Sequence, residues 1–132
     1  MQLRSLNPQP WLIEQFNINQ AIEVTAGQRV LYVSGQTSND ANGAPLHPGD
    51  IAAQFKQAWA NLTEVLAAAD MTPANVVRLN FYTTDVDTFM ASAGELVPMM
   101  GAAGCTPVAT LLGVTHLFEP SIMIEIEATA VA

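Results

Sequence analysis

The chain has 132 residues, of which 50% are hydrophobic and only 12% are charged. This length predicts one domain, residues 1–132, that is large enough to bury a core. Soluble domains are usually about one quarter charged, so this chain has few charges to spread over its surface. Exposed apolar patches usually mark interfaces. We therefore expect the chain to associate with copies of itself.

The acidic balance and the lack of long apolar stretches limit the partners and the location. Twelve acidic residues against four Lys and Arg give a formal net charge of −8. Nucleic-acid binding draws most of its affinity from Lys and Arg at phosphates, and the four bases here are scattered. No apolar run approaches the ~20 residues that span a bilayer. We expect no nucleic-acid partner, no membrane and, because the first residues lack the apolar run of a signal peptide, a cytoplasmic location.

The N-terminal part of the chain predicts an arm followed by a hairpin. Residues 1–17 form the arm, and its first dozen residues contain two prolines and are expected to be irregular. Residues 21–25 predict a short strand, and residues 29–36, which are rich in Val, Leu and Tyr, predict a second. Residues 26–28 form the turn between them. The two strands are therefore expected to pair.

A long helix follows a loop at residues 38–48, which contains Asn-Gly and two prolines. Asp50 is the expected N-cap, because its side chain can accept hydrogen bonds from the free amides of the first turn. The helix is predicted to end near Ala69. Its apolar residues alternate at spacings of four and three, so that one face covers a core. They are Ile51, Phe55, Ala58, Leu62, Val65 and Ala69.

A second helix is predicted at residues 88–100, capped by Asp85 or Asp87. Gly94 and Pro98 weaken it, because proline removes a backbone donor and crowds the preceding turn. We expect this helix to be kinked or to start late.

Three further strands surround this helix in the sequence. Residues 76–84 precede it, and residues 109–115 and 122–131 follow it. The predicted order is ββαβαββ, which favours an α+β fold of two layers, with a mainly antiparallel sheet and both helices on one face. The other face of the sheet must then meet water, a ligand or another subunit.

Strand alternation predicts what lies on that second face. The core set is expected to be Ile122, Ile124 and Ile126 with Val77, Leu79 and Phe81. The opposite face then collects Glu125, Glu127, Arg78, Asn80 and Tyr82, with Tyr32 and Ser34 from the hairpin. This polar cluster is a solvated face, an interface fixed by an ion pair between Arg78 and a glutamate, or a ligand cleft in which a partly desolvated carboxylate holds water or takes a proton.

Other motifs point to no further chemistry. The sequence has no His-x-Glu, Cys-x-x-Cys or His-x-x-x-His spacing, so we expect no metal site. The single cysteine, Cys105, forms no internal disulfide and is interpreted as a structural thiol. His47 and His116 are interpreted as surface or interface residues.

Four segments, in this order and spacing, resemble the RidA (YjgF) family over about residues 18 to 131. They are Tyr32-Val33-Ser34-Gly35-Gln36, Pro48-Gly49-Asp50-Ile51 with Gln54, Val76-Val77-Arg78 through Asp85 with Phe89, and Ile124-Glu125-Ile126-Glu127-Ala128. The resemblance implies a chorismate-mutase-like fold and a homotrimer with clefts between subunits. It also implies hydrolysis of reactive enamines and imines to 2-keto acids and ammonia without a cofactor. In the family an arginine grips the substrate carboxylate and a glutamate positions the attacking water.

The family residues carry over only in part. Glu125 matches the water-positioning glutamate, and Gly35 matches the pocket glycine. The arginine becomes Ala109, and the family tyrosine near the start becomes Ile18, before Asn19. The cysteine that some members place just after the arginine becomes Leu111, and the second-helix asparagine becomes Ala93.

These departures predict an apolar cleft in which a carboxylate has no cation, so that 2-aminoacrylate deamination should be weak or absent. Three readings stay open. The first is a cofactor-free hydrolase for a less anionic substrate, with Glu125 as base or water-holder and with Gly35, Asn19, Asn80 or Tyr82 assisting. The second is a non-catalytic trimeric binding or interaction protein. The third is imine deamination with another cation recruited.

Overall fold

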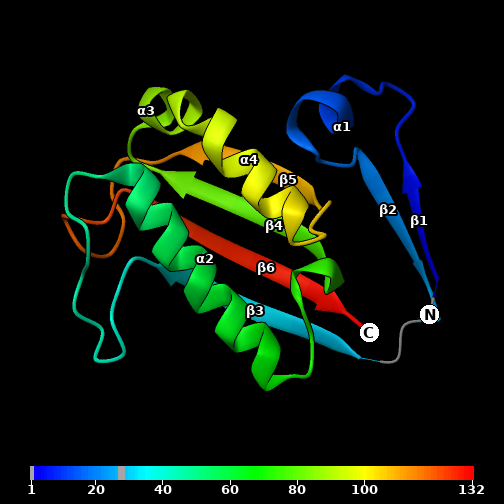
Figure 1. Cartoon of the computed structure of the whole chain (residues 1–132), viewed down its shortest axis with the longest axis horizontal. Coiled ribbons are helices and arrows are strands. Elements are labelled where there is room, and N and C mark those ends of the chain that lie inside the picture. The colour runs from blue at the N-terminus through cyan, green and yellow to red at the C-terminus, as the bar shows by residue number, and fades with distance from the viewer. Residues whose placement is uncertain (1, 27–28) are drawn as a thin grey trace.

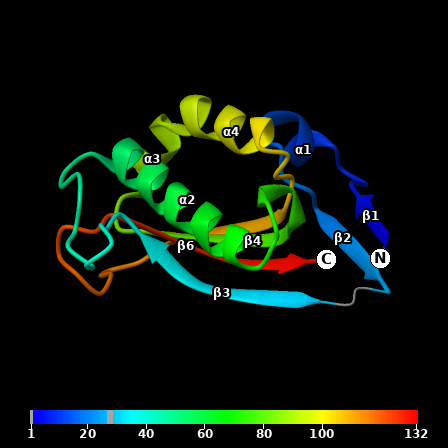
Figure 2. The same cartoon turned by 60° about the horizontal axis from the view of Figure 1, so that its bottom comes forward.

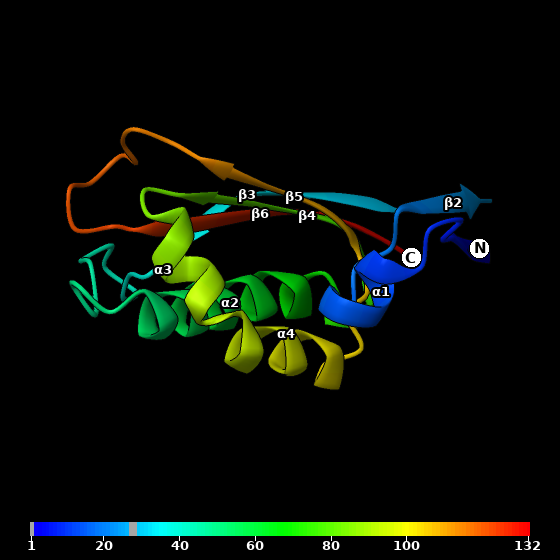
Figure 3. The same cartoon turned by 90° about the horizontal axis from the view of Figure 1, so that it is seen from above.

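The chain forms a sheet of four strands covered on one face by helices. The computed structural model describes residues 2–26 and 29–132. In order across the sheet the strands are β3, β6, β4 and β5. Figure 3 shows the helices on the same side of this sheet, as the predicted two-layer α+β fold requires. The elements are β1 (Gln2–Leu6), α1 (Trp11–Phe16), β2 (Ala21–Thr25), β3 (Val30–Thr37), α2 (Ile51–Ala68), a 3₁₀ turn (Pro73–Asn75), β4 (Val76–Thr83), α3 (Val86–Ala91), α4 (Ala93–Ala102), β5 (Val108–Gly113) and β6 (Ile124–Val131).

The sheet is mainly antiparallel, as predicted. β6 lies between β3 and β4 and is antiparallel to both. β5 is parallel to β4 because the connection between them crosses over through α3 and α4. A parallel neighbour requires such a crossover, whereas an antiparallel one does not.

The N-terminal arm is more regular than expected, and the predicted hairpin is wrong. β2 pairs with β1 in a separate antiparallel ribbon, with Gln2 opposite Thr25. Figure 1 shows this ribbon at one end of the molecule, beside α1. The ion pair between Arg4 and Glu23, at 3.0 Å across the ribbon, favours this partner. Of the predicted turn, Gly27 and Gln28 lie outside the described residues.

The long helix matches its prediction closely. Asp50 is its N-cap, and the Asp50 side chain accepts a hydrogen bond from the Ala53 amide at 3.0 Å. The predicted apolar face is buried at Ile51, Phe55, Ala58 and Leu62, whereas Val65 and Ala69 are half-buried. Phe55 lies at the centre of an aromatic cluster with Trp59, Phe81 and Phe89, whose ring centroids are within 6.1 Å of the Phe55 ring.

The second predicted helix is two helices that meet at Ser92. Asp85 caps α3 by accepting hydrogen bonds from the Thr88 amide and hydroxyl. The break lies six residues before Pro98, which is inside α4. The predicted kink is therefore a break that lies two residues before Gly94 and not at Pro98: α3 ends where the Ser92 amide donates to the Phe89 carbonyl.

The core set is confirmed except at one position of β4. The register between β4 and β6 shifts between Val76 and Arg78, so Val76 is buried and Val77 is only half-buried. Leu79 and Phe81 face the helices, together with Ile124 and Ile126 of β6. Figure 2 shows the long helix lying over these strands.

Candidate functional site

Glu125 and Gly35 lie in direct contact on the sheet face opposite the helices. A Cβ atom built on Gly35 would collide with the Glu125 carboxylate and would lie 2.6 Å from its Cδ atom. Only glycine lets the backbone of β3 and this carboxylate approach so closely. The sequence comparison joined these two residues by resemblance, and the structure places them side by side.

The backbone beside Gly35 is freed by a break in the strand ladder. Val33 pairs with Ala128 and Gln36 pairs with Ile126, so two residues of β3 lie opposite the single residue Glu127. Such a bulge leaves the extra residue without its ladder partner and re-aims neighbouring groups. The Ser34–Gly35 segment therefore presents exposed backbone next to Glu125.

Glu127 is held by two neighbours on β4. Its carboxylate accepts a hydrogen bond from Asn80 Nδ2 at 3.1 Å and a short one from the Tyr82 hydroxyl. The bond from Tyr82, followed by that from Asn80, lowers the pKa of Glu127, because both stabilise the ionised carboxylate. The same bond raises the pKa of Tyr82. Glu127 is thus an ionised, fixed acceptor.

The pKa of Glu125 is shifted in the opposite direction to that of Glu127. Burial raises the pKa of Glu125, and the negative charge of Glu127 raises it further. Desolvation and a like charge both disfavour the ionised form. Glu125 is therefore the more basic of the two carboxylates and the better candidate to take a proton.

The remaining polar residues predicted for this face also lie there. Arg78, Asn80, Glu127 and Tyr32 line a hollow of about 240 Å³ on the strands. Arg78 is exposed, and the ion pairs found in the described part of the chain join other residues. An ion pair between Arg78 and a glutamate, one of the alternatives for this face, is therefore not made within one chain and stays a prediction for an interface between chains. Asn80 Oδ1 is buried and has no hydrogen-bond partner in that part of the structure.

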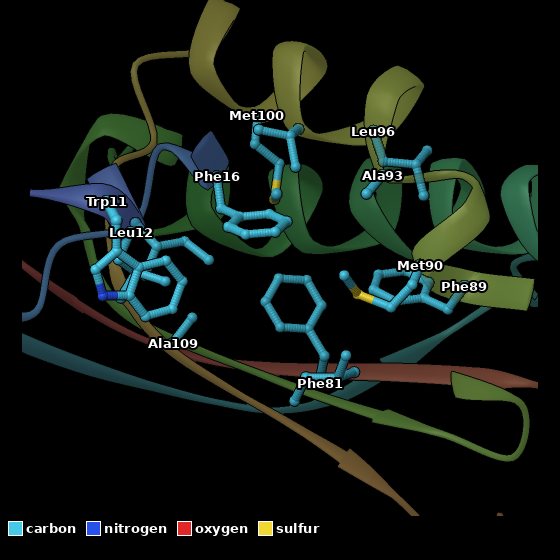
Figure 4. A pocket seen from close by; sticks show the side chains of 13 residues that line it. Trp11, Leu12, Phe16, Phe81, Phe89, Met90, Ala93, Leu96, Met100 and Ala109 are labelled. Carbon is cyan, nitrogen blue, oxygen red and sulfur yellow. The ribbon is translucent and has the colours of Figure 1, made fainter. Parts of the chain in front are cut away.

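Three other predicted site residues lie on the helix side of the sheet. Ala109 pairs with Leu79 and Leu111 pairs with Phe81, so their side chains face the helices with these core residues. Together with Ile18 they line an apolar cavity of about 230 Å³ between α1, α3, α4 and the strands β4 and β5 (Figure 4). One chain therefore does not bring Ala109, Leu111 and Ile18 to Glu125 and Gly35, because the sheet separates the two groups.

Asn19 is buried, and its polar groups are hydrogen-bonded to other parts of the chain. It is 4% exposed, its backbone N–H donates to the Pro107 carbonyl at 2.7 Å, and its side-chain Nδ2 donates to the Thr106 carbonyl. It also accepts a hydrogen bond from Asn7. These bonds tie the end of the arm to the segment before β5, and they occupy the groups that were expected to assist a ligand.

The cysteine and the histidines lie outside both groups. Burial raises the pKa of Cys105 to about 12, so its thiol stays protonated and is a poor nucleophile. His47 and His116 are exposed. Among residues 2–26 and 29–132, no three His, Cys, Asp or Glu side chains group as metal ligands would. In the same part of the chain, no helix is long and apolar enough to cross a membrane.

Sequence reasoning missed the residues that α1 adds to the cavity. Trp11, Leu12 and Phe16 line it from a segment that was expected to be an irregular arm. Their spacing of one and four residues directly after Pro10 is typical of a helix that starts at a proline. That signal was present, but it covers less than two turns.

Comparisons with known proteins fit this geometry. Residues 14–132 match the family described as Endoribonuclease L-PSP. Two proteins named 2-iminobutanoate/2-iminopropanoate deaminase are similar to the chain. The rat protein is 37% identical over 103 residues, covering 78% of this chain and 73% of its own, and the mouse protein is 34% identical over 113 residues, covering 86% and 79%.

Solved structures agree on the fold. The YyfB protein of Yersinia pestis, described as a protein of unknown function of the Rid family, has a TM-score of 0.87 at 34% identity and matches over 100% of both chains. The YjgF gene product of E. coli has a TM-score of 0.69 at 26% identity, covering 82% of this chain and 84% of its own. The predicted resemblance is confirmed: the chain belongs to the RidA (YjgF) family.

Proposed function

We propose that this protein is a RidA-like homotrimer that binds a small molecule between subunits and hydrolyses an enamine, an imine or a related metabolite without a cofactor. The contact between Glu125 and Gly35 carries this proposal, because it sets a half-buried carboxylate of raised pKa beside freed backbone. The names of the rat and mouse relatives, both imine deaminases, support the reaction class.

The proposed chemistry needs one base and one water. The Glu125 carboxylate takes a proton from water as the water oxygen bonds to the imine carbon. That proton passes to the imine nitrogen and gives a neutral carbinolamine. Glu125 then takes the carbinolamine hydroxyl proton and passes it to the amino group as the C–N bond breaks, so that the carbonyl product forms and ammonia leaves. A carboxylate of raised pKa is a stronger base near neutral pH, and such general-base assistance contributes about 10²–10⁴-fold in rate.

The opposite orientation of the two groups of site residues supports assembly from two subunits. Glu125 and Gly35 lie on the open sheet face, whereas Ala109, Leu111 and Ile18 lie on the helix side. A cleft that uses both groups needs a second chain to supply one of them. The exposed ring of Tyr32, 81% accessible on the sheet face, is the kind of side chain that such an interface covers.

The substrate is proposed to differ from 2-aminoacrylate. Ala109 stands where the family arginine would grip a carboxylate, and the residues around it are apolar. Removing a charged partner from a desolvated carboxylate costs several kcal/mol, roughly a hundredfold or more in binding. We therefore expect weak or no acceleration of 2-aminoacrylate hydrolysis.

The test is an imine-hydrolysis assay in which 2-iminobutyrate is generated enzymatically and 2-keto acid formation is followed. The wild type should give little acceleration, and Ala109→Arg should give at least tenfold more. Ala60→Arg, at an exposed position of α2, is the matched control and should give none. Loss of the Ala109→Arg gain in the Ala109→Arg/Glu125→Ala double variant would support hydrolysis by Glu125. No gain from Ala109→Arg, with no turnover of neutral imines, would instead favour a non-catalytic metabolite-binding trimer.

A further inference from the structure

The apolar cavity on the helix side is built from three directions. α1 supplies Trp11, Leu12 and Phe16, α3 and α4 supply their inner faces, and β4 and β5 supply the floor. Figure 4 shows Phe16 and Phe81 projecting into the space from opposite sides. The cavity measures about 230 Å³. It is separate from the polar face that carries Glu125.

The lining contains no charged side chain. Its thirteen residues are all apolar or aromatic, and the indole N–H of Trp11 is the one side-chain hydrogen-bond donor among them. A carboxylate that entered would lose its hydration and gain no partner, which is costly. An uncharged apolar group loses little hydration and gains dispersion contacts.

The size of the cavity limits which uncharged ligands can fit. A dry protein cavity of ~150 Å³ lined by aliphatic and aromatic residues holds benzene. The cavity here, at about 230 Å³, leaves room beyond a single ring. It fits an aromatic ring that carries a short aliphatic chain.

The wall formed by α1 is fixed from outside the cavity. Asn17 takes a left-handed conformation at the end of α1 and donates through Nδ2 to the Cys105 carbonyl at 3.3 Å. Asn19 then bonds to Thr106 and Pro107. These contacts hold the helix end against the segment before β5, so collapse of α1 into the space would break them. Trp11 is 50% exposed at the rim, and a ligand would cover its ring.

We propose that this cavity binds the uncharged apolar part of a small ligand, an aromatic ring with a short aliphatic chain, and rejects carboxylates. The inference rests on the proposed function and deepens it, since this cavity is the helix-side part of the proposed cleft between two subunits. It names the substrate class: a neutral, ring-bearing imine or related compound. The binding itself does not depend on Glu125, which lies on the other face of the sheet.

Two probes of nearly equal size test the chemistry. n-Propylbenzene and 3-phenylpropanoate share a ring and a short chain but differ in charge. Binding is read from the fluorescence of Trp11, with Trp11→Phe to identify its signal against that of Trp59. n-Propylbenzene should give a saturable change that Trp11→Phe removes, and 3-phenylpropanoate should bind at least tenfold more weakly at pH 7. No saturable change, or equal binding of both probes, would overturn the proposal.

A charge placed in the cavity should reverse the preference. Ala109→Arg should bind 3-phenylpropanoate at least tenfold better than the wild type and n-propylbenzene worse. The exposed control Ala60→Arg should keep the wild-type order. An unchanged order in Ala109→Arg, or an experimental structure with a side chain of a second copy filling the cavity, would contradict the assignment.

The two proposals fail in different ways. Glu125→Ala should keep the binding of n-propylbenzene within about twofold of the wild type. If neutral probes bind but no imine is hydrolysed in a Glu125-dependent manner, the ligand site stands and the hydrolase proposal falls. If hydrolysis depends on Glu125 but neutral probes do not bind, the hydrolase stands and the ligand class falls.

Discussion

Glu125 and Glu127 are two residues apart on one strand, yet their carboxyl groups have pKa values shifted in opposite directions. Glu127 accepts hydrogen bonds from Tyr82 and Asn80, whereas Glu125 lies against Gly35 and is partly desolvated. Environments that separate the pKa values of neighbouring titratable groups are a mark of acid–base sites. Here the separation assigns the fixed anion to Glu127 and the proton acceptor to Glu125.

The opposite shifts predict opposite pH effects on stability. The folded pKa of Glu125 is raised, so the folded state binds this proton more tightly, and the unfolding free energy should fall as pH rises from the ordinary carboxyl pKa through the raised one. Glu125→Gln should therefore remove this loss and be neutral or stabilising at pH 7. Urea unfolding between pH 4 and 7 measures it, and a wild type that gains more stability than Glu125→Gln over that range would contradict the assignment.

Glu127 behaves in the ordinary way for a hydrogen-bonded carboxylate. Its folded pKa is lowered, so its contribution is present above the ordinary carboxyl pKa and is lost as pH falls through the lowered value. Glu127→Gln should therefore reduce stability at pH 7 and make the protein less sensitive to acid. Glu64→Gln, at an exposed position of α2, is the matched control and should change neither.

Gly35→Ala should separate activity from stability. The three heavy atoms nearest to the added Cβ all belong to the side chain of Glu125, which is flexible and can move, and Gly35 does not have a positive φ. We expect the unfolding free energy to change by less than about 1 kcal/mol, as is usual away from the core. Hydrolysis should fall at least tenfold, because Glu125 leaves its position.

A double-variant cycle checks this coupling. If Gly35→Ala acts through Glu125, its effect on hydrolysis should disappear in the Glu125→Ala background, since contacting residues are not additive. Equal losses in both backgrounds would show that Gly35 acts independently of the carboxylate.

Loss of the Asp50 cap should weaken α2. The Asp50 side chain accepts the Ala53 amide, and replacing such a cap by Ala usually costs about 1 kcal/mol. Asp50→Ala should lower the unfolding free energy by about that amount in urea titrations, and Asp50→Ser should recover most of it. Asp50→Ala without loss would mean that solvent satisfies the helix end equally well.

Much of the fold was predictable because its signals are local and periodic. The spacing from Ile51 to Leu62 defines a helix face, and the alternation from Ile124 to Glu127 assigns each side chain to a sheet face. The partner of Ala21–Thr25 was not predictable, because strand pairing depends on long-range contacts and the ribbon with Gln2–Leu6 leaves no local mark. The register shift at Val77 was not predictable for the same reason, since a bulge changes the strand register without changing the alternation of apolar and polar residues in the sequence.

In the candidate site, too, the residues placed by local alternation were predictable, and those placed by long-range strand pairing were not. Alternation alone put Glu125 and Glu127 on the open face, and resemblance added Gly35. That Ala109 faces the helices follows only from its pairing with Leu79, a register that the sequence does not specify. The cavity was missed because it needs α1, a six-residue helix too short to give a clear periodic signal.

Tyr32→Ala should weaken self-association. Tyr32 is 81% exposed on the sheet face, in a chain with few charges to cover its surface. Tyrosine is enriched among the few interface residues whose truncation costs about 2 kcal/mol or more. The wild type should show a light-scattering mass near three times 14.1 kDa, and Tyr32→Ala should dissociate at a protein concentration at least tenfold higher than the wild type. Phe118→Ala is the matched control, since Phe118 is 72% exposed on the loop between β5 and β6. A wild-type mass near 14.1 kDa would refute the trimer, and equal effects of the two variants would show that the sheet face is not the interface.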